Sequence, residues 1–138
     1  MATMTGGFAR EISSLGEVFS SLAGFFGEEL DERSAFCINL VVEELFTNMV
    51  RHNHGGGGTI GLRVERQEDR IELELIDTDV DSFDFADVQE APVTAGIEER
   101  RAGGLGLHIV RAMVDSLDYD YDDEKREMRI SVTKVLEH

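Results

Sequence analysis

The chain has 138 residues, of which 41% are hydrophobic, and this is enough for one ordinary domain with one hydrophobic core. Its 13 Lys and Arg residues against 29 Asp and Glu residues give a formal net charge of −16, which repels nucleic-acid phosphates and anionic lipids and argues against direct binding to nucleic acid or membranes. Because no stretch approaches the roughly 18 apolar residues of a membrane span, and no signal core follows a basic N-terminus, we expect a cytoplasmic protein.

The chain shows no internal repeat and no domain boundary, so residues 1–138 are expected to form a single domain. The one cysteine, Cys37, lies in the apolar run FCINLVV, which predicts a small buried hydrophobic side chain and excludes an internal disulfide. Residues 136–138, Leu-Glu-His, resemble the start of an expression-tag remnant, and we assign them no function.

Two helices are predicted in the first half of the chain. Residues 8 to about 29 have apolar side chains at steps of three and four, which is typical of an amphipathic helix: Phe8, Ile12, Leu15, Val18, Phe19, Leu22, Phe25 and Phe26. A second helix is predicted from an N-cap at Asp31 to about His52. Its apolar stripe has the same spacing: Ile38, Val42, Leu45 and Met49. The run HNHGGGG then ends it, because glycines do not hold a helix.

The second half of the chain predicts strands around one further helix. Residues 60–65 and 71–76 alternate with a period of two, which predicts neighbouring strands joined by QEDR. Residues 78–102 show no sustained period, and so long a loop indicates a functional segment or lid. A helix from about Leu105 to Ser116 and two strands, at about 117–121 and 127–135 around the turn DDEKR, complete a predicted two-layer α+β sandwich.

Asp77 is the first residue that indicates chemistry. The alternation that turns Leu73 and Leu75 toward the core turns Asp77 the same way. A carboxylate on the core face needs hydrogen-bond donors, and an amino group of a bound ligand is one such donor. The alternative is that Asp77, at the end of its strand, caps the turn that follows.

Glu44, Asn48 and His52 follow one another at steps of four, so they lie in a line beside the apolar stripe of the second helix. Asn48 could offer a neutral oxygen to a hard cation, with Glu44 as a base near it. By spacing alone, the solvated flank of an amphipathic helix is the more ordinary interpretation. His52 and His54 do not indicate a metal site, because no cysteine or third well-spaced ligand stands beside them.

Three glycines, Gly103, Gly104 and Gly106, stand where the last predicted helix begins. Their missing side chains would expose backbone N–H groups and the positive end of the helix dipole to an anion such as phosphate. Glycines also serve tight turns and close packing, so this loop is a weak signal by itself. The order of the features strengthens it: a helix with Glu and Asn, a strand that ends in an inward Asp, a long loop, and glycines that open a helix.

In this order, EELFTNMVRH, IELELIDT and GGLGLHIVRAMVD resemble the N, G1 and G2 boxes of the ATPase superfamily that contains histidine kinases, gyrase and Hsp90-type chaperones. The likeness is strongest to the anti-sigma-factor serine kinases of the RsbW and SpoIIAB type, and it extends from about residue 8 to 135. It implies the Bergerat fold, a two-layer sandwich with a mixed, mostly antiparallel sheet and helices on one face. Mg-ATP would bind between the helices and the lid.

The resemblance also implies roles for individual residues. Glu44 matches the general base, Asn48 matches the residue whose amide oxygen helps to hold Mg2+, and Asp77 matches the acceptor of the adenine amino group. The residues that match the basic lid and the phosphate-binding turn form one segment: Arg100, Arg101, Gly103, Gly104, Leu105 and Gly106.

By the same resemblance, the protein would be an ATP-dependent serine kinase that sequesters a sigma factor and phosphorylates a STAS-domain antagonist, and the first helix adds support for a homodimer. One departure is that the G1 box of the family reads Asp-x-Gly, whereas this chain reads Asp77-Thr78-Asp79. Asp79 places a side chain and a negative charge near an anionic nucleotide. The alternative is therefore a partner-binding module of the same fold with weak or absent nucleotide binding. A detached catalytic domain of a histidine kinase is a third interpretation.

Overall fold

The computed structural model describes residues 1–52, 58–78 and 105–136 of the chain. Five strands in these ranges form one sheet: β1 (Ala2–Ala9), β2 (Thr59–Arg66), β3 (Arg70–Thr78), β4 (Ser116–Asp122) and β5 (Glu127–Val135). The helical elements within the described residues are a short 3-10 helix and three α-helices: η1 (Ile12–Ser14), α1 (Leu15–Phe26), α2 (Glu32–His52) and α5 (Leu105–Met113). The strand order is β1-β2-β3-β5-β4, and every pairing among these strands is antiparallel.

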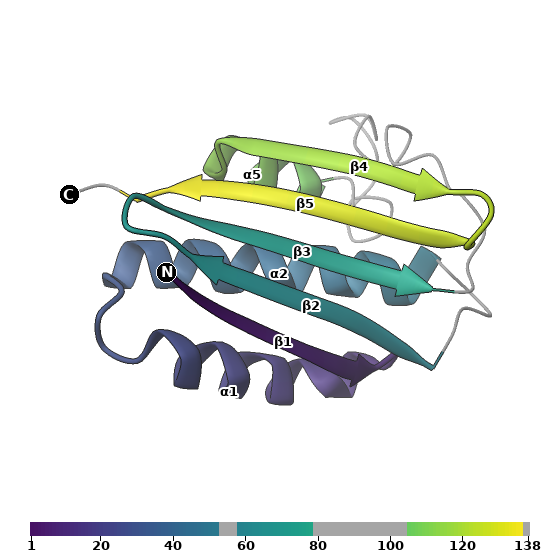
Figure 1. Cartoon of the computed structure of the whole chain (residues 1–138), viewed down its shortest axis with the longest axis horizontal. Coiled ribbons are helices and arrows are strands. Elements are labelled where there is room, and N and C mark those ends of the chain that lie inside the picture. The colour runs from purple at the N-terminus through teal and green to yellow at the C-terminus, as the bar shows by residue number, and fades with distance from the viewer. Residues whose placement is uncertain (53–57, 79–104, 137–138) are drawn as a thin grey trace.

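The three α-helices lie on one face of the sheet, so the described elements form two layers (Figure 1). The core lies between these layers, and both contribute large side chains that are almost fully buried: Leu22, Ile38, Leu45, Phe46, Met49, Ile60, Ile71, Leu75, Met128 and Ile130. The predicted two-layer α+β sandwich is confirmed. Among the described residues, none of the helices combines the length and the apolar character that crossing a membrane requires.

The N-terminal segment differs from its prediction. Residues 2–9 form the edge strand β1, so the helix predicted from residue 8 does not start there, and α1 begins only at Leu15. Within β1, Met4 and Gly6 are half-buried and Phe8 is buried, each between exposed neighbours. Gly6 leaves room for the Phe8 ring, since a Cβ on Gly6 would lie 3.3 Å from two ring carbons. The helix prediction was wrong here because Phe8 falls in phase with the apolar positions of α1, although pairing with β2 satisfies this backbone.

The ends of the first two helices follow from local chemistry. Gly27 ends α1 with a φ of +58°, a left-handed conformation that glycine adopts without steric cost. Asp31 then caps α2, because its Oδ2 accepts the backbone N–H of Ser34 at 3.0 Å. Both the cap and the extent of α2 confirm their predictions, and Cys37 is buried near the start of the helix as expected.

Both predicted hairpins are present. In the first, between β2 and β3, the N–H of Gln67 donates to the carbonyl oxygen of Arg70 at 2.8 Å. In the second, between β4 and β5, the carboxylate of Asp122 accepts the N–H of Glu124 at 3.0 Å, and Arg126 closes the turn with a φ of +51°. These turns set the register of the pairs, which places the alternating apolar residues of β2, β3 and β5 on the helix side.

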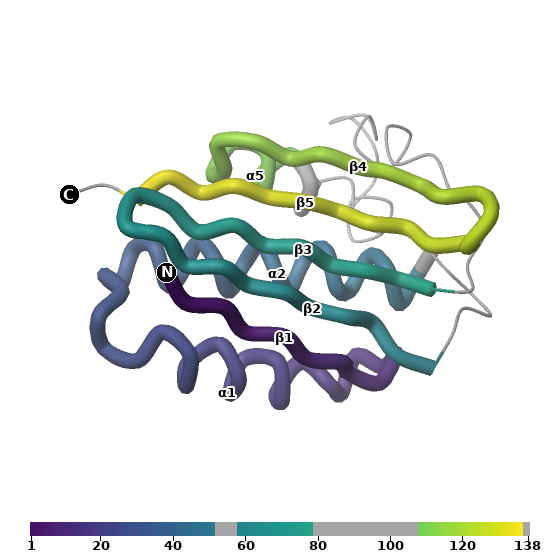
Figure 2. The backbone as a smooth tube through the Cα atoms, in the orientation of Figure 1, coloured from purple at the N-terminus to yellow at the C-terminus, as the bar shows by residue number. Residues whose placement is uncertain are grey.

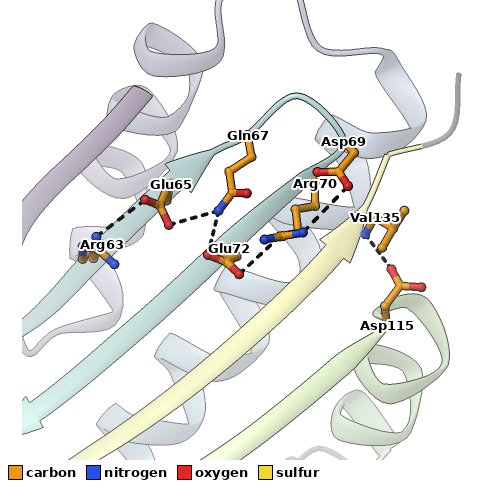
Figure 3. A network of polar contacts seen from close by, with 8 residues as sticks. All are labelled: Arg63, Glu65, Gln67, Asp69, Arg70, Glu72, Asp115 and Val135. Atoms are coloured by element: carbon orange, nitrogen blue, oxygen red, sulfur yellow. Dashed lines mark hydrogen bonds and ion pairs between the residues drawn. The ribbon is translucent and has the colours of Figure 1, made fainter. Parts of the chain in front are cut away.

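The face of the sheet that points away from the helices is polar around the first hairpin (Figure 3). A chain of contacts runs along it from Arg63 to Glu65, from Glu65 to Gln67, from Gln67 to Glu72 and from Glu72 to Arg70. Pairs of this kind between solvent-accessible side chains contribute little to folding. They keep this face solvated, and the buried polar residues Asn48 and Asp77 lie on the helix side of the sheet.

The last strand is fastened at its end. The N–H of Val135 donates to Oδ2 of Asp115 at 2.6 Å, as Figure 3 shows, and the N–H of Leu136 donates to the carbonyl oxygen of Asp69 at 2.8 Å. Leu136 is only 8% exposed and joins the core. This packing does not bear on its interpretation as the start of a tag remnant, which stays a prediction. Residues 137 and 138 lie outside the described part of the chain.

Candidate functional site

Three elements end close to one another at one end of the sandwich. β1 and β3 run in the same direction toward this end, and α2 reaches it with its C-terminal half (Figure 2). The sequence continues from α2 into residues 53–57 and from β3 into residues 79–104. The site predicted from the sequence therefore begins here, on the helix side of the sheet.

Asp77, near the end of β3, is fully buried. The alternation along β3 places it on the same face as Leu75, which confirms the predicted inward orientation. Its neighbours across the sheet are Ile60 on β2 and Met128 on β5, and both are fully buried apolar residues. An ionised carboxylate in such a row needs a specific partner, because burying a lone charge costs several kcal/mol or more.

Arg10 provides that partner. Its Nη2 forms an ion pair with Oδ1 of Asp77, and its Nη1 donates a 3.2 Å hydrogen bond to the carbonyl oxygen of Met49 on α2. The backbone N–H of Arg10 donates to the carbonyl oxygen of Gly58 at 3.1 Å. The side chain is only 11% exposed, and this burial lowers the pKa of the guanidinium. Arg10 thus connects the end of β1 with α2, β3 and the residue that precedes β2.

The sequence analysis missed Arg10 because it assigned the segment after Phe8 to a helix. The signal that could have found it is a period of two: Met4, Gly6, Phe8 and Arg10 share one side of an extended chain. This alternation puts a guanidinium in line with a buried aromatic ring, which predicts a buried acidic partner. The alternative role of Asp77 as a turn cap involves residues after Thr78, which lie outside the described part of the chain.

Asn48 is the second buried polar residue of the site. It is 1% exposed, and its amide nitrogen makes no hydrogen bond to the residues that the structure describes. The solvated-flank interpretation is therefore wrong for Asn48. A buried donor without a partner costs about 1–3 kcal/mol, so this amide is poised for an acceptor that comes from outside the described residues. Asn48 directly precedes Met49, whose carbonyl oxygen accepts the hydrogen bond from Arg10. One turn of α2 therefore carries both the Asn48 amide and the backbone group that binds Arg10.

Glu44 lies one helical turn before Asn48 on α2 and is half-buried. Burial raises the pKa of its carboxyl group, the negative charge of Glu43 raises it further, and Arg51 opposes both effects. A carboxylate with a raised pKa is a stronger base, which is the property that proton abstraction requires. The predicted line of Glu44 and Asn48 along α2 is therefore present, with one side chain buried and the other at the border of the solvent.

The remaining predicted residues are only partly described. α5 begins at Leu105, as predicted for the helix that follows the glycines, and Gly106 lies in its first turn. Six other predicted residues lie outside the described part of the chain: His54, Asp79, Arg100, Arg101, Gly103 and Gly104. For His52 and Leu105, only the backbone is described. Within residues 1–52, 58–78 and 105–136, no group of three or more His, Cys, Asp and Glu side chains is placed to hold a metal ion.

The fold agrees with a comparison against known protein families. A family model of the histidine kinase-like ATPase domain matches residues 8–134, so the chain belongs to this family. Among its relatives is the serine-protein kinase RsbW of Halalkalibacterium halodurans, which is 32% identical over 104 residues, or 72% of this chain and 62% of that protein. The serine-protein kinase RsbW of Listeria innocua is 30% identical over 123 residues, or 82% of this chain and 74% of that protein.

These matches confirm the resemblance to the serine kinases of the RsbW type. The alignment with the Halalkalibacterium protein spans less than two thirds of the length of that relative. The family match also supports the use of ATP, since the matching family is a kinase-like ATPase domain. The described residues offer two buried polar groups at this end of the sandwich: the Asp77 carboxylate, which pairs with Arg10, and the Asn48 amide, whose nitrogen lacks a hydrogen-bond partner among them.

Proposed function

We propose that the protein is a cytoplasmic, ATP-dependent protein-serine kinase that acts as an anti-sigma factor. It would sequester a sigma factor and phosphorylate a STAS-domain antagonist of that complex. The observation that carries the proposal is the pair of buried polar residues, Asp77 and Asn48, at one end of an otherwise apolar core of a histidine kinase-like ATPase fold. The similarity to the RsbW kinases supports serine as the acceptor residue.

Each described residue has one task in this proposal. Asp77 accepts a hydrogen bond from the amino group of adenine, and the amide oxygen of Asn48 joins the ligands of Mg2+. When bound, Mg-ATP would supply the γ-phosphoryl group, with ADP leaving as its bond to the γ-phosphorus breaks, and Mg2+ would offset the negative charge of the phosphates. Glu44 receives the proton that the hydroxyl group of the target serine loses when its oxygen attacks the phosphorus. Most of the rate acceleration comes from positioning and charge, because phosphoryl transfer needs no covalent intermediate on the protein.

The phosphate-binding segment completes the proposed site. The support for it is the place of these residues in the sequence, directly before and in the first turn of α5. Backbone N–H groups at the start of a helix bind phosphate oxygens, and basic residues before them can contact the terminal phosphate. The residues proposed for this task are those named from the sequence: Arg100, Arg101, Gly103, Gly104, Leu105 and Gly106.

The test is phosphate transfer to a STAS-domain antagonist in the presence of Mg-ATP. We expect Glu44→Gln to lower the rate of transfer by about 10²-fold to 10⁴-fold, the usual contribution of a general base. Glu43→Gln is the matched control, because Glu43 is the adjacent acidic residue but is exposed to solvent. Unchanged transfer by Glu44→Gln would exclude the proposed base. Acid-stable phosphate on the antagonist would indicate phosphoserine, whereas acid-labile phosphate would indicate a histidine kinase domain.

A partner-binding module remains the second candidate, and Asp79 in place of the G1 glycine is the observation that favours it. Partner binding should then persist without nucleotide. Calorimetric titration with millimolar Mg-ATP separates the two functions. A kinase must bind ATP and so give a heat of binding, whereas a partner-binding module need not bind ATP. Recovery of ATP binding in Asp79→Gly would identify the carboxylate as the cause. Light scattering of the same samples would test the proposed homodimer.

A further inference from the structure

We propose that Arg10 is part of the subsite that recognises the base, where its guanidinium donates a hydrogen bond to N1 of adenine while Asp77 accepts one from the N6 amino group. This inference rests on the proposed function, since it requires an adenine nucleotide at Asp77. It adds a residue from the first strand to a site that the sequence analysis built only from later segments.

The first observation is the position of the guanidinium. It lies against the carboxylate of Asp77, the one acidic residue in the described part of the chain that is fully buried. It is held from a second side by the carbonyl oxygen of Met49, at 3.2 Å. Two contacts from two different elements fix the plane of the guanidinium, and the planar group carries five N–H donors in a rigid fork. A guanidinium held in this way has enough donors for Asp77, for Met49 and, in the proposed complex, for the edge of a base.

The second observation is the complementarity of the pair with adenine. The hydrogen-bonding edge of adenine presents an N–H donor on N6 next to a bare acceptor at N1. A carboxylate matches only the donor. The ion pair of Arg10 and Asp77 brings a donor group next to an acceptor group, which is the combination that this edge requires. Arg10 would therefore satisfy the part of the base that Asp77 leaves without a partner.

The ion pair also controls the state of Asp77. In the row across the sheet, Asp77 has the apolar residues Ile60 and Met128 as its neighbours, so its negative charge depends on the guanidinium. An ionised carboxylate only accepts hydrogen bonds, whereas a protonated one also donates. By keeping Asp77 ionised, Arg10 preserves it as an acceptor for the amino group.

The same pairing disfavours bases with the opposite pattern. Hypoxanthine and guanine carry O6 in place of the amino group and an N–H at N1. Their oxygen would face the carboxylate, and their N–H would face the guanidinium. Both contacts would then be repulsive, and sites built on hydrogen bonds reject such analogues strongly because their own polar groups are left unpaired.

The experiment compares three magnesium-bound nucleotides by calorimetry with the full chain: ATP, ITP and 1-deaza-ATP, in which a C–H group replaces N1. For the unmodified protein we expect 1-deaza-ATP to bind roughly 10-fold to 100-fold more weakly than ATP, the range for a hydrogen bond to a charged group. ITP should bind more weakly still. These comparisons need no substitution, so they decide the inference even if an Arg10 variant does not fold.

Substitutions then assign the effect to Arg10. In Arg10→Lys and Arg10→Met, the difference between ATP and 1-deaza-ATP should fall to about twofold or less. Arg63→Met is the matched control, because Arg63 lies on the polar face of the sheet and should leave the difference unchanged. Loss of the difference in both Arg10 variants, and not in the control, would support a direct contact with N1.

Two results would overturn the inference, and they differ in what they say about the proposed function. Equal affinity of the unmodified protein for ATP and 1-deaza-ATP would by itself exclude the contact with N1, and tighter ATP binding by Arg10→Met would show in addition that Arg10 competes with the base for Asp77. The nucleotide site itself would stand in that case. No binding of any of the three nucleotides would remove the proposed kinase function, and the inference with it.

Discussion

At the scale of single residues, the ion pair of Arg10 and Asp77 is the feature on which both folding and the proposed base recognition depend. Its two members differ in exposure, since the Asp77 side chain is fully buried and the Arg10 side chain is 11% exposed. An isolated charge at the Asp77 position has only Ile60 and Met128 beside it in the sheet. The pair should therefore behave as a unit when either member is replaced.

We expect Arg10→Met to lower the free energy of unfolding by about 3–5 kcal/mol, because it leaves the buried carboxylate without its counter-charge. The double variant Arg10→Met with Asp77→Leu should lose less than Arg10→Met alone, since it leaves no unpaired charge in the core. Urea denaturation of the unmodified protein, both single variants and the double variant measures this coupling. Additive losses would show that the two side chains do not interact.

Glu44 should make stability depend on pH in the direction opposite to that of an ordinary paired carboxylate. Its folded-state pKa is raised, chiefly by burial, so the folded protein binds the proton more firmly than the unfolded chain does. Stability should therefore fall as pH rises from the unfolded pKa of a glutamate, about 4.3, through the higher folded-state value. Urea midpoints measured over this pH range should therefore fall less in Glu44→Gln than in the unmodified protein.

The activity of Glu44 should follow the same titration. Phosphate transfer requires the ionised form, so the rate should rise with pH through the raised pKa. Because the charge of Glu43 contributes to the raised pKa of Glu44, Glu43→Gln should move the inflection to lower pH. An inflection at the same pH in both proteins would contradict the assignment of this titration to Glu44.

At the scale of elements, α2 carries two of the proposed functional side chains and depends on its N-cap. Hydrogen bonds from the side chain and the backbone N–H of Ser34 lower the pKa of Asp31. Stability from this cap is therefore present above the unfolded pKa of Asp31 and is lost as pH falls through the lower folded value.

We expect Asp31→Ala to lower the urea midpoint at pH 7, because the first turn of α2 loses its hydrogen-bond acceptor. Asp31→Asn is the matched control, since Asn also caps helices but does not titrate. It should keep most of the stability at pH 7 and should lack the part of the acid-induced loss that Asp31 causes. Equal midpoints for Asp31→Ala and the unmodified protein would show that the cap contributes nothing to folding.

The elements also show which predictions from the sequence were sound. The extent of α2, the two hairpins and the start of α5 were predicted correctly, because periodicity, an N-cap and polar turns are local signals. The strand β1 was missed because Gly6 and Gly7 interrupt its apolar alternation, and because an edge strand forms by pairing with a partner far along the chain, here β2. Phe8 was therefore assigned to the wrong kind of element.

At the scale of the whole molecule, the net charge of −16 should oppose the compact state through repulsion between like charges. We expect added salt to stabilise the protein, because the screening length falls from about 30 Å at 0.01 M to about 8 Å at 0.15 M ionic strength. Melting temperatures at increasing NaCl concentration, at constant pH, test this effect. A melting temperature that falls over this range would contradict it.

The same charge should guide association with a partner. A basic partner surface would be attracted at a distance, so its association rate should fall steeply with salt, whereas dissociation should change little. Stopped-flow measurements at several salt concentrations would separate the two rates once a partner is in hand. This salt dependence is opposite in sign to that expected for folding stability, so the two effects can be distinguished in one series of buffers.

The sequence by itself determined the order and type of most elements, the inward direction of Asp77 and the place of Glu44 and Asn48 on one helix, because these follow from local repeats of two or 3.6 residues. Only the tertiary structure decided that Asn48 is buried, that residues 2–9 complete the sheet, and that Arg10 is the partner of Asp77. Burial and ion pairing depend on which distant segments pack together. A local period of two can indicate that Arg10 has a buried acidic partner, but it does not identify that partner as the carboxylate at the end of the third strand.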